Sequence, residues 1–187
     1  MIPGDVDDPK GFRAPRTMTP DQLGDSVARL VWESFSDFIA EGDAEALLGE
    51  MGLSADDGVP DEHAAEEMLI FFMWAHTRGV QQAFLSRAPE GLVRGGLDAL
   101  HSAVFEDMVT HGTPRAQLPI FEQRVGARYA EYYTAADSSD AAVGTAVVRH
   151  LTKKPAKPTV LSQALADQAV AVAHPLRDFL EEVQLVD

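Results

Sequence analysis

Two histidines occupy the positions from which this chain could most readily do chemistry. His76 lies one helical turn after Phe72, and His101 lies between Leu97 and Phe105, so each is in phase with a run of apolar residues. Histidine titrates near neutral pH and is the commonest metal ligand, so a buried pair could hold a metal ion or act as acid and base. The other interpretation is that both rings belong to the core and are satisfied by helix carbonyls or by a tyrosine hydroxyl.

A counting argument predicts that these histidines lie near each other and are partly buried. If the chain turns near residue 88, positions whose numbers sum to about 177 face one another, because both helices rise equally per residue. His76 and His101 meet this condition. The same count about a turn near residue 112 places Arg124 opposite His101, where a guanidinium disfavours a cation. The core interpretation is therefore favoured, and the candidate ligand-binding residues are His76, His101, Arg124 and Tyr129.

A second group of candidate metal ligands begins the most apolar segment of the chain. His63 and Glu67 are four residues apart and so share a helix face, and Glu66 is also within reach of His63. Di-metal helical bundles use Glu-x-x-His on two helices together with two further glutamates, whereas here the order is reversed and occurs once. A solvated first turn, with acids placed favourably against the helix dipole, is the preferred interpretation. The candidate metal ligands are thus His76, His101, His63 and Glu67.

Composition excludes several classes of function. The chain has no cysteine, which removes disulfides, thiolate nucleophiles and cysteine-ligated metals. It has no Gly-x-Ser-x-Gly motif and no phosphate-binding Gly-x-x-x-x-Gly-Lys loop, so the sequence predicts no cofactor and argues against an enzyme. A net charge of −15 disfavours nucleic acid and anionic membranes as partners. Without a signal peptide or a membrane-length apolar run, the expected location is the cytoplasm.

The element that must position these residues is the segment 60–88. It contains eight consecutive apolar residues, Met68 to Ala75, and its apolar pattern continues to Leu85 without a turn signal. A helix that is apolar on every side has no face to offer to water and belongs in the middle of a bundle. The length of the segment favours a helix over a buried strand.

The remaining segments also have helical periodicity, so the predicted fold class is all-α. We expect a single-domain antiparallel bundle of six or seven helices around the central helix at 60–88. Residues 1–18 contain three prolines and no periodicity and are expected to form an N-terminal arm. Residues 19–187 form the helical domain, with a basic, proline-containing connector at 152–158. The last segment keeps its helical phase across Pro175, which favours a kinked helix over two separate ones.

Three functions remain open from the sequence. The first is a non-enzymatic protein that binds a protein partner, or a second copy of itself, through apolar residues left over from the bundle. The candidates for this surface are Trp32, Leu176, Phe179, Leu180 and Val183. The second is a small-molecule or metal-binding bundle centred on His76 and His101. The third is an acidic, immunity- or antitoxin-like neutraliser of a basic partner, whose binding would weaken with salt.

Overall fold

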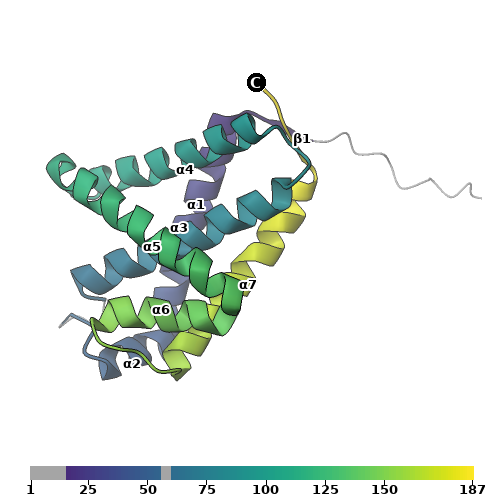
Figure 1. Ribbon diagram of the computed structural model, residues 1–187. Helices are drawn as coiled ribbons and strands as arrows, with labels where there is room; N and C mark the ends of the chain where they lie inside the picture. Colours follow the sequence, from purple (N-terminus) through teal and green to yellow (C-terminus); the bar gives the residue numbers. More distant parts are fainter. Residues whose placement is uncertain (1–15, 56–59) are drawn as a thin grey trace, which may run out of the picture.

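The central apolar segment forms α3 (Glu62–Phe84), which runs through the middle of the molecule (Figure 1). The structure is a computed structural model that describes residues 16–55 and 60–187. Asp61 caps α3 by accepting a hydrogen bond from the backbone N–H of Ala64. The side chains from Met68 to Trp74 are at most 4% exposed. This confirms that the segment is a helix enclosed on all sides.

The described part of the chain has six further α-helices, and all of them except the second pack directly on α3. They are α1 (Pro20–Ala40), α2 (Gly42–Glu50), α4 (Glu90–Thr110), α5 (Leu118–Ser138), α6 (Asp140–Thr152) and α7 (Val160–Glu181). The all-α, single-domain prediction is confirmed. None of these helices combines the length and the apolar character needed to cross a membrane. The helix α7 continues through Pro175 without a break, so one helix and not two occupies this segment.

The local signals at helix starts were reliable where a threonine side chain could reach the backbone. Thr19, which is followed by a proline and has Gln22 three residues further on, has the sequence pattern typical of a helix start, and the two side chains form a capping box at the start of α1. The similar signal at Thr113 does not start a helix directly. A short 3-10 turn, Arg115–Gln117, comes first, and α5 begins at Leu118.

Two short strands join the beginning and the end of the described chain. β1 (Arg16–Met18) pairs in parallel with β2 (Val183–Leu185), so Arg16 is opposite Val183. Residues 16–18 of the arm expected over 1–18 form the strand β1, and Val183 lies in the small sheet, because α7 ends at Glu181. The rest of the arm, residues 1–15, lies outside the described residues.

Glycines decide which helices pack closely. A Cβ on Gly24 of α1 would clash with Ala99 of α4, and a Cβ on Gly96 would lie 2.7 Å from Leu23, so these two helices cross in close contact. As a result α4 packs mainly on α1 and only lightly on α3. The hairpin count that placed His76 opposite His101 assumed that α3 and α4 lie against each other along their length. That assumption is wrong for this fold.

The close α1–α4 contact gives a first prediction. Gly24→Ala should lower the free energy of unfolding by about 1–3 kcal/mol, because the new methyl group has no room beside the α4 backbone. The matched control is Gly126→Ala on α5, where a Cβ meets nothing within 4 Å. That change should raise the free energy of unfolding by about 0.5–1 kcal/mol. Urea unfolding of both variants checks the pair, and equal effects would contradict the packing argument.

Candidate functional site

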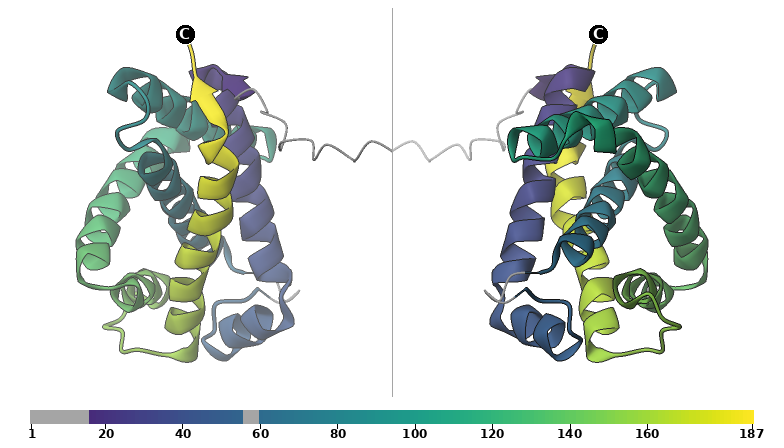
Figure 2. Two further views of the ribbon diagram at one scale, coloured as in Figure 1. Left: turned by 90° about the vertical axis from the view of Figure 1, so that its right-hand side faces the viewer. Right: turned by 90° about the vertical axis from the view of Figure 1, so that its left-hand side faces the viewer.

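A groove of about 740 Å³ lies between α1 and α7. These two helices run side by side along one face of the molecule (Figure 2, left view). Both pack on α3 more than on each other, so α3 provides the floor between them. We call this hollow the α1/α7 groove. Its lining residues come from α1, α7, β1 and one residue of α3, His76.

The α1 wall of the groove consists of two rows of residues at four-residue spacing. Residues four apart lie above one another on a helix face, so each row follows the groove. The inner row is Ser26, Leu30, Ser34 and Phe38, and the outer row is Arg29, Glu33 and Asp37, followed by Glu41, the C-cap residue just beyond α1. The outer row is exposed and carries three carboxylates and one guanidinium. This wall is therefore acidic at its rim and mixed in polarity deeper down.

The α7 wall is almost entirely apolar. Its members are Gln168, Val172 and Leu176 in one row and Ala171, Pro175 and Phe179 in the other. Pro175 has no N–H, so the carbonyl of Ala171 lacks its usual helix donor. Phe179 is 37% exposed. At the same end, the Arg16 guanidinium lies 6.0 Å from the centre of the Phe179 ring.

His76 lies in the floor of the groove in a defined hydrogen-bonded state. Its Nδ1–H donates to the carbonyl oxygen of Phe72 at 2.7 Å, so in the neutral ring Nε2 is an acceptor. The Ser34 hydroxyl lies 3.5 Å from Nε2, at the limit of a hydrogen bond. Burial lowers the pKa of His76 to about 4, against a smaller opposing effect of the Phe72 hydrogen bond. The ring is therefore neutral at physiological pH.

The Ser34–His76 contact resembles a nucleophile–base pair but lacks the groups that would activate it. A histidine with a pKa of about 4 is a poor general base near neutrality. Its Nδ1 is oriented by a backbone carbonyl and not by a carboxylate. Both residues lie inside long helices, where backbone N–H groups are engaged in helical hydrogen bonds and are not free to stabilise an oxyanion. The pair is better suited to binding than to catalysis.

His101 lies in a separate polar network. Its Nδ1–H donates to the carbonyl of Leu97 at 2.6 Å, and the Tyr129 hydroxyl donates to its Nε2 at 2.8 Å. The Tyr129 oxygen is 3.4 Å from the hydroxyl of Thr77. Burial raises the pKa of the Tyr129 hydroxyl. The predicted tyrosine partner of His101 is thus present, while His76 has its own partners and no hydrogen bond to this network among the described residues.

Glu67 and Arg124 each form an ion pair that ties α5 to α3. Glu67 is fully buried, and its two oxygens accept from Nε–H and Nη2–H of Arg128, both at 2.9 Å. This hydrogen bond raises the pKa of Arg128. Arg124 pairs with Glu66 nearer the surface, and not with His101. Both arginines therefore serve the α3–α5 contact.

His63 does not join Glu67 in a ligand set. Its Nε2–H donates to the carbonyl of His150 at 2.9 Å, while His150 itself binds Glu131 at 2.6 Å. Burial acts to raise the pKa of Glu131, but hydrogen bonds from His150 and Arg149 outweigh it and leave the pKa below its ordinary value. Within residues 16–55 and 60–187, no three His, Asp or Glu side chains are grouped so that they could hold a metal ion.

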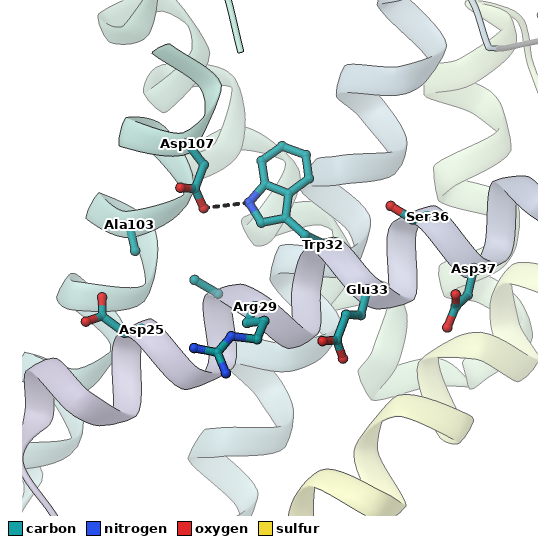
Figure 3. Close-up of a pocket in the computed structure, with 9 residues that line it drawn as sticks. Asp25, Arg29, Trp32, Glu33, Ser36, Asp37, Ala103 and Asp107 are labelled. Carbon is teal, nitrogen blue, oxygen red and sulfur yellow. Dashed lines mark hydrogen bonds between the residues drawn. The ribbon is translucent and has the colours of Figure 1, made fainter. Parts of the chain in front are cut away.

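The residues predicted for a protein interface are only partly on the surface. Leu176, Leu180 and Val183 are at most 3% exposed and belong to the core, which leaves Phe179 as the accessible member of that stripe. Trp32 is partly buried, and its indole N–H donates to Asp107 of α4 at 2.9 Å (Figure 3). Figure 3 also shows Glu33 and Asp37 on the side of α1 away from the Trp32 ring.

Sequence reasoning missed the acidic row on α1 and the buried Glu67–Arg128 pair. The row could have been found, because Glu33, Asp37 and Glu41 recur at four-residue spacing beside an apolar stripe. The ion pair could not, because its partners are 61 residues apart and no local pattern joins them. Comparison of the chain with protein-family models, with curated proteins and with solved structures finds no match.

The two ion pairs give a second prediction. Arg128→Met should lower the free energy of unfolding by about 3–5 kcal/mol, because it leaves the Glu67 carboxylate buried and unpaired. The matched Arg124→Met should cost less than about 1 kcal/mol, since the Glu66 pair is partly solvated. The double variant Glu67→Leu/Arg128→Met should recover most of the loss. Urea unfolding measures all three, and a double variant as unstable as Arg128→Met would contradict this account.

The buried His76 gives a third prediction, on pH. The pKa of His76 is about 4 in the folded chain, against an ordinary value of 6.5. Between these two pH values the unfolded chain binds a proton at this ring and the folded chain does not. The contribution of His76 to the free energy of unfolding is fully present above pH 6.5. It is lost as the pH falls towards 4, by about 3 kcal/mol in total. Urea unfolding from pH 7.5 to 4.5 should show a shallower decline for His76→Phe and His76→Gln than for the original chain. Identical declines would contradict the assignment.

Proposed function

We propose that this chain is a non-enzymatic binding protein that takes up a basic, amphipathic helical segment of another protein in the α1/α7 groove. The observation that carries the proposal is the pairing of an apolar wall on α7 with an acidic rim on α1. A helix with one apolar and one basic face matches both walls at once. This mode, a helix lying in a groove of helices, is a recurring form of peptide recognition.

The size of the groove suits such a segment. Its α1 wall extends from Ser26 to Phe38, which corresponds to about 18 Å or just over three helical turns, and Glu41 follows at the end of the helix. Phe179 is exposed at one end of the apolar wall, and Val172 and Leu176 lie deeper between the helices. Burial of apolar side chains against this wall would supply most of the affinity.

Charge selects a basic partner over a second copy of the chain. The outer row carries Glu33, Asp37 and Glu41, and the whole chain has a net charge of −15. A second copy would bring like charges together, whereas lysines and arginines would be attracted at long range and would dock faster. The proposal thus joins the interaction hypothesis to that of an acidic neutraliser.

A small-molecule site at His76 is the second candidate. The groove volume of about 740 Å³ lies in the range of ligand pockets. The charged row along one rim, which runs for about three turns of α1 to its C-cap, fits an elongated segment better than a compact molecule. His101 has separate partners, so the structure supplies no support for a shared site of the two histidines.

A titration with a designed peptide tests the proposal. The probe is a helical peptide of about 16 residues with leucines and one tryptophan on one face and lysines on the other. It should bind with an affinity that falls steeply between low and high salt, because the rim contacts are electrostatic. The reversal Glu33→Lys/Asp37→Lys should weaken binding by roughly tenfold or more at low salt. Fluorescence anisotropy of a labelled peptide measures both effects.

Matched controls separate the groove from the general charge of the chain. Asp98→Lys/Glu122→Lys makes the same change in net charge at exposed positions on α4 and α5 and should leave affinity nearly unchanged. Phe179→Ser should weaken binding, while Leu85→Ser, at a residue 76% exposed outside the groove, should not. Equal effects of the two charge reversals, or no binding of the peptide at low salt, would contradict the proposal.

A further inference from the structure

We infer that His76 Nε2 is the acceptor that selects the anchor of the bound segment, and that this anchor is an aromatic ring with one neutral hydrogen-bond donor. The indole of a tryptophan and the phenol of a tyrosine both have this chemistry. The inference rests on the proposed function and adds to it the identity of the contact made at the groove floor. It is carried by the hydrogen bonding and the surroundings of His76.

The Nε2 lone pair of His76 has one long hydrogen bond, from the Ser34 hydroxyl, and both residues line the groove. Nδ1–H is committed to the Phe72 carbonyl at 2.7 Å, which fixes the tautomer and directs the Nε2 lone pair away from its own helix. His76 is 3% exposed and yet lines the groove, so the ring is almost entirely held by the protein. The Ser34 hydroxyl, at 3.5 Å, is too far from Nε2 for a strong bond. A buried acceptor with so poor a partner gains by accepting from a ligand.

The residues around this acceptor are apolar, which determines the class of donor. Leu30 and Phe38 lie one turn to either side of Ser34 in the inner row of α1. Opposite them Leu176 approaches Gly79, one turn after His76, so closely that a Cβ on that glycine would lie 2.8 Å from its Cδ2. An ammonium or guanidinium placed here would lose its hydration beside a neutral ring. Cationic side chains therefore bind at the exposed rim, and a neutral donor binds at the floor.

An aromatic ring with a polar edge satisfies both requirements. Tryptophan and tyrosine bring a large apolar surface and a single N–H or O–H that needs a partner when buried. Both residues, like arginine, are enriched among the interface residues that contribute most to binding. Aliphatic anchors would fill the groove but leave Nε2 without a donor, so they should bind less tightly.

Fragment titration tests the inference without any partner protein. Indole and 1-methylindole have nearly the same shape, but only indole can donate a hydrogen bond. Binding is followed by NMR through the methyl groups of Val172 and Leu176 and the Nε2 resonance of His76 in ¹⁵N-histidine-labelled full-length protein. Indole should bind about five- to tenfold more tightly than 1-methylindole and shift the Nε2 resonance. The pair p-cresol and 4-methylanisole should repeat the difference.

Variants show whether the preference comes from His76. In His76→Phe, whose folding is checked by circular dichroism, the indole to 1-methylindole ratio should fall to about one. Ser34→Ala removes the competing hydroxyl and should keep or increase the ratio. If His76→Phe does not fold, the Nε2 shift in the unsubstituted protein still decides, because it needs no substitution.

Each contrary outcome has a definite meaning. Equal affinities with no Nε2 shift overturn the acceptor role. So does binding that perturbs only the second pocket, which Trp32, Ala103 and Asp107 line between α1 and α4, or the absence of any fragment binding in the groove. If indole is preferred but the basic helical peptide does not bind, the subsite is a small-molecule site, and the proposed function fails instead. If the peptide binds but no donor preference exists, only this inference fails.

Discussion

The enclosure of α3 is the constraint on which the rest of the structure depends. Its side chains from Met68 to Trp74 are at most 4% exposed, so every direction around the helix must be covered by another element. Any polar group on this helix then lies in a dry environment and must find a partner. Glu67 finds the guanidinium of Arg128, and His76 finds the carbonyl of Phe72. These two buried polar contacts follow from the burial of one helix.

The same constraint explains why a groove exists. α1 and α7 both pack on α3, but each also packs on a second helix, and this keeps the two apart. α1 is in close contact with α4 through Gly24, and α7 is in close contact with α6, where a Cβ on Gly144 would clash with the Ser162 carbonyl. The α1/α7 groove lies between these two helices because they share α3 as a neighbour but pack on different second helices. His76 lies in the groove because it is the α3 residue that faces it.

The sequence was informative wherever a signal is local, and much less so where it is not. The eight apolar residues from Met68 predicted the central helix, and Thr19 with Gln22 predicted the start of α1. Which helices would touch was not predictable from short connections, because small residues such as Gly24 decided the contact between α1 and α4. The parallel pairing of Arg16 with Val183 joins strands of three residues from distant parts of the chain, which no periodicity reveals. The four-residue spacing of the acidic row on α1 is visible in the sequence. The row indicates a binding groove only together with the apolar wall of α7 opposite, which the sequence does not reveal.

The histidine in the groove shows how a requirement of the fold can become a recognition feature. Burial disfavours the charged ring, and the Phe72 carbonyl fixes which nitrogen carries the proton, so the side chain presents a single acceptor in one direction. Since the helix that holds it is rigid and enclosed, little conformational entropy is left to lose when a donor arrives. The carboxylates on the outer row of α1 are in the opposite situation, because they are exposed to solvent and act at long range. The carboxylates of the rim would thus attract a partner, and His76 at the floor would select it. These two functions lie on different helices, α1 and α3. Only the attraction by the rim depends strongly on salt.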